Sequence, residues 1–197
     1  MSEKFAGKIA VITGGSTGMG LATAKRFVRE GMDHVFITGR REDVLDAAIA
    51  EIGRNATGVP GDVAHLGDIG RLYEAVQQRG RKIDVLFANA GVAKLAALAT
   101  VDEKFFDFHF DANVKGLFFT VQKGLPLMND GGSITLTSSI AAIKGFPEMS
   151  VYSATKPPCA RSLAPGPTSS ASGGRSARAT STRRFSRVCS RATRWSG

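Results

Sequence analysis

The fold is decided by residues 8–30, which read KIAVITGGSTGMGLATAKRFVRE. Residues 8–13 are a short apolar run rich in β-branched side chains, which predicts a buried strand. The glycine-dense residues 14–20 predict a tight turn, and residues 21–30 keep apolar side chains at helical spacing before Gly31. The predicted order is therefore strand, glycine-rich turn, helix.

The same alternation continues along the chain. Further strands are predicted at His34–Thr38, Thr57–Pro60, Ile83–Ala88 and Ser133–Thr137, and helices at Glu42–Ile52, Leu66–Arg79, Asp102–Asp111 and Val114–Met128. Apolar strands separated by helices are typical of a parallel sheet that is covered on both faces. The predicted fold class is α/β, a doubly wound parallel sheet of the Rossmann type, whose pattern stops after the fifth strand.

The glycine-rich turn contains the first candidate binding residues. Glycine lets the backbone approach a pyrophosphate closely at the positive end of the following helix. An ordinary turn between a strand and a helix is the plain alternative. The order of the elements, with a second strand ending about 20 residues further on, favours a dinucleotide site. The candidate cofactor-binding residues here are Gly14, Ser16, Thr17, Gly18, Met19 and Gly20.

The end of the second predicted strand indicates which dinucleotide binds. A fold that prefers NAD places an acidic residue there to hold the ribose 2′-hydroxyl, whereas this chain continues as Thr38-Gly39-Arg40-Arg41. Two guanidinium groups without a carboxylate suit the 2′-phosphate of NADP, so Arg40 and Arg41 are its candidate ligands. The alternatives are that these arginines are only solvated, or that NAD is the cofactor.

Tyr152 and Lys156 form a candidate acid–base pair. They are four positions apart, so on a helix they share one face and their polar ends can converge. A cation about 4 Å from a phenol favours its ionised form, which would let the tyrosine act as a general acid and base near neutral pH. The spacing alone is common and carries little weight.

Taken together, these residues resemble the short-chain dehydrogenase/reductase family, classical type, over residues 5–156. The ordered motifs are Thr13-Gly14-x-x-x-Gly18-x-Gly20, Asp62-Val63, Asn89-Ala90-Gly91, Asn113, and Ser139 with Tyr152-Ser153-Ala154-Thr155-Lys156. The resemblance implies an oxidoreductase that transfers a hydride between NADP(H), or NAD(H), and a secondary alcohol or ketone.

The resemblance also implies catalytic roles. Tyr152 would exchange a proton with the substrate oxygen, Lys156 would favour the phenolate and bind the cofactor ribose, and Ser139 would hydrogen-bond the reacting oxygen. Asn113 would hold a water of the proton relay. Taken alone, Ser139 could instead be a hydroxyl that caps a loop, and Asn113 a residue of a helix kink.

Further residues would contact the cofactor by the same resemblance. Asp62 and Val63 would line the adenine, and Asn89, with Ala90 and Gly91, would brace the strand end beside the cofactor. Tyr152 and Lys156 are counted among the cofactor-binding residues as well.

The pattern changes after Lys156. Residues 157–197 contain eight arginines and no lysine, aspartate or glutamate, a composition that predicts a basic, disordered tail. Pro157 and Pro158 predict that the helix of Tyr152 breaks at Lys156. A frameshift explains this tail, because codons for Ala-Ala-Val-Arg-Ser-Leu, a common family continuation, encode Pro-Pro-Cys-Ala-Arg-Ser when read one base late. Residues 1–156 are thus predicted to be an incomplete NAD(P)-binding domain, and the chain as written is expected to be weakly active or inactive.

Charge and composition limit the other functions. The formal net charge of +9 divides into +1 for residues 1–156 and +8 for residues 157–197, so the body favours neither nucleic acid nor a membrane surface. Both cysteines lie in the tail, the three histidines lack metal-ligand spacing, and a secretory signal pattern is missing at Met1. We therefore expect a cytoplasmic protein without a metal, whose partner is a small-molecule alcohol or ketone.

Two other classes of function remain open. The chain could be a non-catalytic remnant that binds a dinucleotide, or, less favoured, a nucleic-acid binder that acts through the tail arginines. The family resemblance implies a homo-oligomer.

Overall fold

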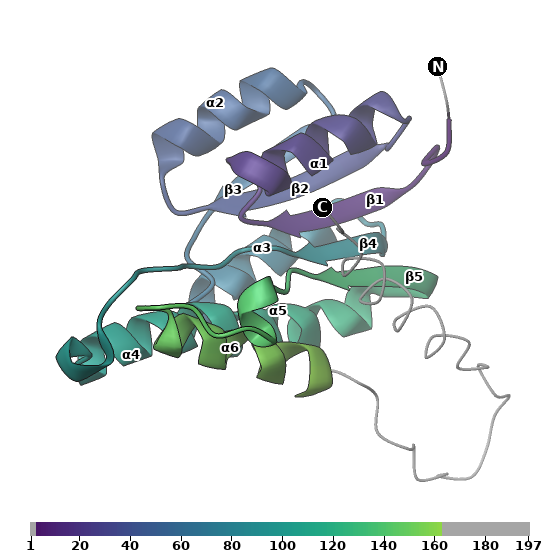
Figure 1. The fold of residues 1–197 in the computed structure, drawn as a ribbon. Helices are drawn as coiled ribbons and strands as arrows, with labels where there is room; N and C mark the ends of the chain where they lie inside the picture. The colour runs from purple at the N-terminus through teal and green to yellow at the C-terminus, as the bar shows by residue number, and fades with distance from the viewer. Residues whose placement is uncertain (1–2, 163–197) are drawn as a thin grey trace, which may run out of the picture. The chain divides into compact units, whose positions relative to one another are not determined.

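Five parallel strands form one sheet in the order β3-β2-β1-β4-β5 (Figure 1). This computed structural model describes residues 3–162, with side chains described for residues 3–156. The strands are β1 (Ile9–Thr13), β2 (His34–Gly39), β3 (Ala56–Pro60), β4 (Ile83–Ala88) and β5 (Met128–Leu136). The predicted α/β fold with a doubly wound parallel sheet is confirmed.

Helices cover both faces of this sheet. The elements between the strands are α1 (Gly18–Arg29), α2 (Glu42–Ile52), α3 (Leu66–Gln78), α4 (Glu103–Phe110), a π-helical turn η2 (Asp111–Gly116) and α5 (Leu117–Gly124). Short 3₁₀ turns are η1 (Leu98–Thr100), η3 (Leu125–Leu127) and η4 (Ile140–Ala142), and α6 (Ser150–Ser162) follows β5. Figure 1 shows α1 and α2 over one face of the sheet and α3 and α5 over the other.

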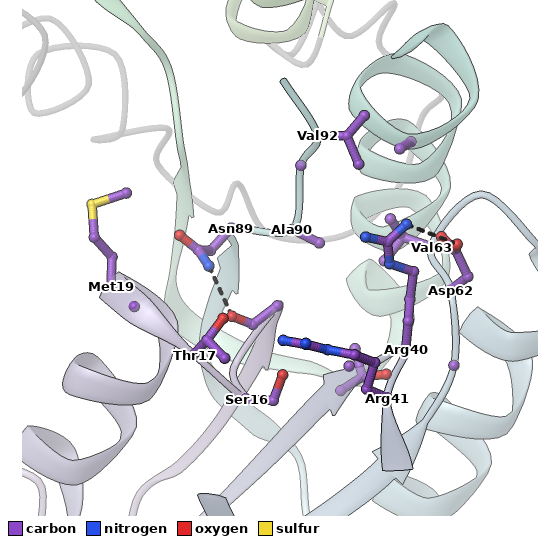
Figure 2. Close-up of a pocket in the computed structure, with 17 residues that line it drawn as sticks. Ser16, Thr17, Met19, Arg40, Arg41, Asp62, Val63, Asn89, Ala90 and Val92 are labelled. Atoms are coloured by element: carbon purple, nitrogen blue, oxygen red, sulfur yellow. Dashed lines mark hydrogen bonds and ion pairs between the residues drawn. The ribbon is translucent and has the colours of Figure 1, made fainter. Parts of the chain in front are cut away.

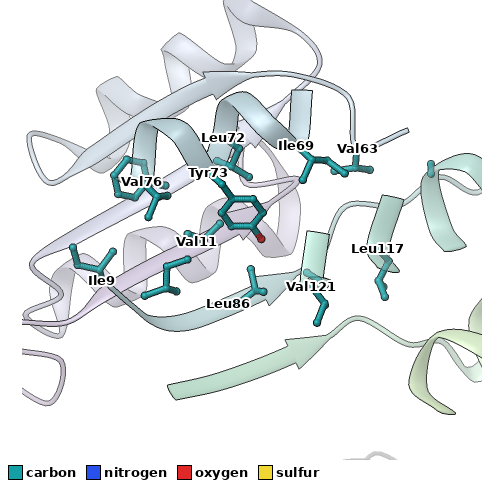
Figure 3. Packing of buried hydrophobic residues seen from close by; sticks show 14 residues of the cluster. Ile9, Val11, Val63, Ile69, Leu72, Tyr73, Val76, Leu86, Leu117 and Val121 are labelled. Carbon is teal, nitrogen blue, oxygen red and sulfur yellow. The ribbon is translucent and has the colours of Figure 1, made fainter. Parts of the chain in front are cut away.

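Strand β1 lies in the middle of the sheet and contributes side chains to the hydrophobic clusters on both faces. Its side chains alternate between the faces, so Ile9 and Val11 join the cluster under α3 and α5, and Ala10 and Ile12 join the cluster under α1 and α2. All of these side chains are fully buried. Figure 3 shows the first cluster, in which Tyr73 of α3 packs among aliphatic side chains.

The strand order reverses between β1 and β4. From β1 the chain runs outward through β2 to β3 and then returns to β4 on the other side of β1. The register pairs Thr13 with Ala88, so both strands end at the same level. In open α/β sheets a ligand crevice forms at this point, outside the carboxyl ends of the strands.

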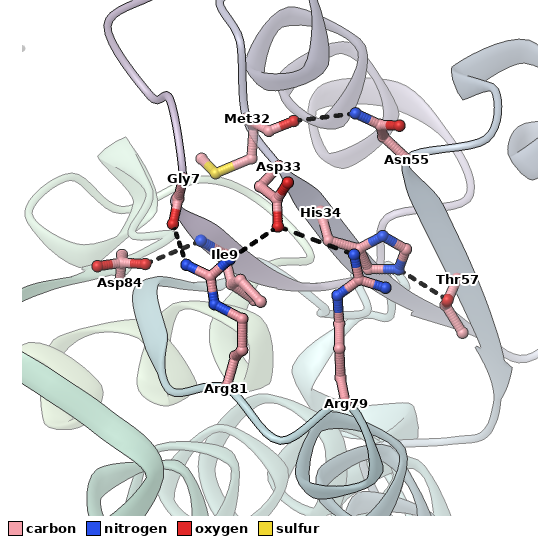
Figure 4. A network of polar contacts seen from close by, with 10 residues as sticks. All are labelled: Gly7, Ile9, Met32, Asp33, His34, Asn55, Thr57, Arg79, Arg81 and Asp84. Carbon is pink, nitrogen blue, oxygen red and sulfur yellow. Dashed lines mark hydrogen bonds and ion pairs between the residues drawn. The ribbon is translucent and has the colours of Figure 1, made fainter.

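A polar network joins the opposite, amino ends of the strands (Figure 4). Asp84 Oδ2 accepts a hydrogen bond from the backbone N–H of Ile9 at 2.8 Å. Arg81 donates to Asp33 Oδ2 at 3.0 Å and to the carbonyl of Gly7. These contacts hold β1, β4 and the segment before β2 together, far from the carboxyl ends.

The region before β5 differs from the prediction. One helix was expected over Val114–Met128, but the structure has η2, α5 and η3 there, and β5 already begins at Met128. Pro126 lies in η3 and cannot continue a helical hydrogen-bond ladder. The register then shifts between Ile83 and Val85, opposite the segment that contains Gly131 with φ +78°.

The predicted helix break at Lys156 is wrong, because α6 continues through Pro157 and Pro158 to Ser162. The two prolines lack the N–H groups that would donate to the carbonyls of Ser153 and Ala154. The preceding turns of α6 pack against α4, η2 and η4. We attribute the continued helix to this packing, which outweighs the preference of a residue before proline for an extended conformation.

The chain divides into two units, Met1–Ala164 and Pro165–Gly197. The sequence predicts a disordered tail at residues 157–197, of which residues 157–162 belong to α6 and residues 163–197 lie outside the described residues. Seven of the eight tail arginines lie outside the described residues, and Arg161 is in the last turn of α6, so the nucleic-acid alternative stays untested. Within the part that the structure describes, no helix combines the length and the apolar character needed to span a bilayer.

Candidate functional site

A pocket of about 340 Å³ opens at the carboxyl ends of β1, β2 and β4 (Figure 2). Its described lining is Gly14, Ser16, Thr17, Gly18, Met19, Thr38, Gly39, Arg40, Arg41, Gly61, Asp62, Val63, Asn89, Ala90, Gly91, Val92 and Ala112. Every cofactor-binding residue predicted from the sequence is in this lining except Gly20, Tyr152 and Lys156. The sequence missed the contributions of Thr38, Gly39, Gly61, Val92 and Ala112.

Backbone geometry explains the glycines of the turn. Gly14 and Gly18 have φ values of +64° and +54°, a region that residues with a side chain rarely adopt. A Cβ on Gly14 would lie 2.9 Å from the Cα of Ala90, and one on Gly20 only 2.2 Å from the carbonyl oxygen of Gly14. Gly20 thus packs against the turn without lining the pocket. The turn itself exposes backbone without bulky side chains, which suits a pyrophosphate.

Asn89 ties the strand ends around this turn. Its side-chain Nδ2 donates to the carbonyl oxygens of Thr13 at 3.2 Å and Gly14 at 3.1 Å. Its Oδ1 accepts from the hydroxyl of Thr137 at 3.2 Å, just beyond β5. The Thr13 hydroxyl in turn accepts from the backbone N–H groups of Asn89 and Ala90, both at 3.1 Å. One side chain thereby links the ends of β1, β4 and β5.

The adenosine end of the pocket, as the resemblance assigns it, is charged. Arg40 and Arg41 follow β2 directly and line the pocket. Arg40 Nη1 lies 3.8 Å from Asp62 Oδ2, an ion pair that the sequence did not indicate. Val63 beside Asp62 is buried.

Tyr152 and Lys156 converge on α6 as their spacing predicts. The Nζ of Lys156 lies 5.3 Å from the centre of the Tyr152 ring, and Lys156 is only 4% exposed. A Cβ on Gly91 would lie 3.3 Å from this Nζ and 3.0 Å from Asn113 Oδ1. Because Gly91 lines the pocket, Lys156 and Asn113 lie directly behind its wall.

Asn113 occupies the π-helical turn η2. Its amide exchanges two hydrogen bonds of 2.8 Å with the backbone N–H and carbonyl of Val92, and its Nδ2 also donates to Thr155 Oγ1 at 3.0 Å. Thr155 Oγ1 donates in turn to the carbonyl of Tyr152 at 2.7 Å. Asn113 therefore connects the pocket wall to the helix of Tyr152. The sequence did not indicate this π-helical turn, and such turns are frequent at functional sites.

Ser139 caps a turn in the structure. Its hydroxyl accepts from the backbone N–H of Ala141 at 3.2 Å and begins η4, against which α6 packs. This is the capping role considered as an alternative. The hydroxyl proton is still free to be donated, since this contact uses only the oxygen as an acceptor.

The histidines have structural surroundings where they are buried. His109 is fully buried, with Nε2 3.0 Å from the backbone N–H of Lys94 and Nδ1 2.9 Å from the carbonyl of Phe105. His34 Nε2 lies 2.8 Å from the hydroxyl of Thr57. Among the described residues, no group of three or more His, Cys, Asp or Glu side chains could hold a metal ion.

Comparison with known proteins identifies the family. A family model described as short chain dehydrogenase matches residues 8–160. The chain belongs to the short-chain dehydrogenase family. An oxidoreductase of Sarocladium schorii is 47% identical to this chain over 156 residues, which make up 78% of this chain and 62% of that protein. The chain therefore spans less than two thirds of the length of this relative.

Solved structures are similar over the same region of the chain. A 3-ketoacyl-(acyl-carrier-protein) reductase of Brucella melitensis, complexed with NADH, is 29% identical with a TM-score of 0.75, over 80% of this chain and 67% of that chain. A short chain dehydrogenase of Burkholderia cenocepacia in complex with NADP is also 29% identical with a TM-score of 0.75, over 80% and 66% of the two chains.

Proposed function

We propose that the pocket binds a nicotinamide dinucleotide and prefers NADP(H) to NAD(H). The bare backbone at Gly14, the bracing by Asn89 and the helix N-terminus of α1 support binding of the pyrophosphate. Arg40 and Arg41 at the end of β2 support the preference for a 2′-phosphate. The similar structures that carry NADH or NADP support the cofactor class.

The chemistry proposed for this site is the interconversion of a secondary alcohol and a ketone. When bound, the nicotinamide ring supplies or accepts the hydride. Tyr152 gives its hydroxyl proton to the substrate oxygen in reduction and takes it back in oxidation, and Ser139 donates a hydrogen bond to the same oxygen. Lys156 stabilises the phenolate and contacts the ribose, and Asn113 holds a water of the proton relay.

One observation carries this assignment. The Lys156 ammonium and the Asn113 amide both adjoin Gly91, which lines the pocket, and the same ammonium adjoins the Tyr152 ring. Lys156 and Asn113 thus stand behind the Gly91 wall of the same pocket that Arg40 and Arg41 line, which supports one site for the two halves of a dinucleotide.

Titration of NADP⁺ and NAD⁺ against the chain tests the cofactor proposal. We expect tighter binding of NADP⁺, and an Arg40→Ala variant that loses most of this preference, because a charge-assisted contact to the 2′-phosphate disappears. Arg54→Ala is the control, since Arg54 is exposed and outside the pocket lining. Equal affinity for the two cofactors, or an unchanged preference in Arg40→Ala, would reject the assignment.

A non-catalytic protein that binds the dinucleotide is the second candidate. It is favoured by the cap that the Ser139 hydroxyl forms with the N–H of Ala141, because this cap gives Ser139 a structural role that needs no catalysis. Cofactor binding without turnover of any secondary alcohol or ketone would distinguish it from the enzyme.

A further inference from the structure

Arg40 and Asp62 face each other inside the pocket. Arg40 Nη1 is 3.8 Å from Asp62 Oδ2, so the proposed phosphate ligand already has an acidic partner. Both residues line the pocket, and Figure 2 shows the Arg40 side chain turned toward Asp62. The neighbouring Arg41 makes no ion pair with a carboxylate of the described residues. A phosphate that binds Arg40 must therefore compete with the carboxylate of Asp62, whereas a phosphate that binds Arg41 meets no such competition among the described residues.

Asp62 is the fixed member of the pair. Its Oδ1 accepts from the backbone N–H of Ala64 at 3.0 Å, and its own N–H donates to Asp68 Oδ2 at 2.8 Å. The latter hydrogen bond is the main cause that lowers the pKa of Asp68, and Arg71 pairs with the other oxygen of Asp68 at 2.9 Å, so Asp68 is itself held in place. The Arg40 side chain is 56% exposed against 27% for Asp62, so Arg40 is the member that can adjust its position.

A 2′-phosphate bound at Arg40 would share the guanidinium with this carboxylate. Such a phosphate carries a charge between about −1.5 and −2 at neutral pH, so a carboxylate a few ångströms away repels it. A 2′-hydroxyl carries no charge and is not repelled. Asp62 therefore weakens binding of the phosphate relative to the hydroxyl, whatever its contacts with the rest of the nucleotide.

We propose that Asp62 sets the strength of the preference for a 2′-phosphate by holding Arg40 and opposing the phosphate charge. The inference rests on the proposed function, because it requires the adenosine end of a dinucleotide to lie in this part of the pocket. Asp62 then affects cofactor specificity through Arg40. Its carboxylate weakens binding of NADP(H), so the preference for NADP(H) over NAD(H) stays moderate.

The test compares two ligands that differ only in the 2′-phosphate, adenosine 2′,5′-bisphosphate and adenosine 5′-monophosphate. In Asp62→Asn the side-chain oxygen can still accept from Ala64, but the charge is removed. Calorimetry on the full chain should give about tenfold tighter binding of the bisphosphate at low ionic strength, and little change for the monophosphate. The gain should shrink between about 0.01 M and about 0.15 M salt, because the Debye length falls from about 30 Å to about 8 Å.

Two further variants separate this effect from general loss of charge. Asp43→Asn removes an exposed carboxylate near Arg40 in sequence but outside the pocket lining, and should leave the ratio of the two affinities unchanged. In an Arg40→Ala background, Asp62→Asn should give a smaller gain, because no guanidinium is left to release. If Asp62→Asn does not fold, Asp62→Ser carries the same expectations, since its hydroxyl can also accept from Ala64.

The outcomes distinguish this inference from the proposed function. Equal gains for both nucleotides, or weaker binding of the bisphosphate in Asp62→Asn, would overturn the role of Asp62 and leave the cofactor site standing. If neither nucleotide binds to any variant, the proposed function fails, and this inference fails with it.

Discussion

The glycine-rich turn that lines the pocket requires a residue without a side chain at position 20. A Cβ there would meet the carbonyl oxygen of Gly14 at 2.2 Å, so Gly20→Ala must displace the turn. We expect the affinity for NADP⁺ to fall at least about tenfold, since the N–H groups of the turn lose their alignment. Gly67→Ala in α3 is the control, because that position is open. It should raise the free energy of unfolding by about 0.5–1 kcal/mol without affecting the cofactor. Unchanged affinity in Gly20→Ala would mean that the turn tolerates a side chain.

His34 makes stability depend on pH. Burial, and next the positive charge of Arg79, lower its pKa below 6.5. Below pH 6.5 the unfolded chain therefore binds this proton more readily than the folded one, so the free energy of unfolding should fall as the pH drops from about 7 to about 5. Urea titrations should show a smaller fall in His34→Gln, whereas His65→Gln, at an exposed histidine, should follow the parent chain. An identical pH profile in His34→Gln would show that other groups cause the fall.

The elements around the acid–base pair are joined by the hydroxyl of Thr155. Thr155 is fully buried, and its Oγ1 contacts both Asn113 of η2 and the carbonyl of Tyr152. Thr155→Val should lower the free energy of unfolding by about 1–2 kcal/mol, because it leaves these partners partly unsatisfied. Thr120→Val is a matched control, since the buried Thr120 Oγ1 has no hydrogen-bond partner among the described residues, and its removal should cost little. Similar losses in both variants would assign the effect to packing.

Elements were predictable where the signals are local. The bounds of α2 were predicted correctly because apolar spacing defines the helix face and Gly53 ends it. The π-helical turn was missed, since it differs from an α-helix by one residue in the hydrogen-bond ladder and residues 111–116 carry no distinctive composition. The helix through Pro157 was also missed, because the packing of α6 depends on contacts that local preference does not report.

The candidate site also has a part that the sequence could predict and a part that it could not. Its glycines and arginines could be found because their positions follow from the strand–turn–helix order. The Arg40–Asp62 pair and the Asn113–Thr155 hydrogen bond join residues far apart in the chain, 42 positions apart in the second case. The sequence showed each of these residues without showing that they touch.

At the scale of the whole molecule, the match to the family ends at residue 160 and spans 62% of the Sarocladium schorii relative. We expect the 197-residue chain to turn over secondary alcohols and ketones slowly or not at all, because the composition of residues 157–197 does not favour the packed support that a precise catalytic site needs. A chain whose residues after Lys156 are read in the frame of its relatives should gain NADP-linked activity that Tyr152→Phe abolishes. Nicotinamide absorbance measures both.

Two results would contradict this expectation. Robust turnover by the 197-residue chain would show that the matched region is sufficient for catalysis. Activity that survives Tyr152→Phe in the restored chain would show instead that Tyr152 is not the acid and base.

The polar network at the amino ends of the strands should contribute to stability without influencing cofactor affinity. A strand of five residues such as β1 is about 17 Å long, which exceeds the Debye length of about 8 Å at physiological salt. Charges at Asp33 and Arg81 are thus screened from the arginines at the pocket. Arg81→Ala should lower the melting temperature without altering the ratio of NADP⁺ to NAD⁺ affinity, and its effect should add to that of Arg40→Ala. Substitutions at the amino ends of the strands can therefore change the stability of the protein without changing the cofactor preference, which depends on residues at the carboxyl ends.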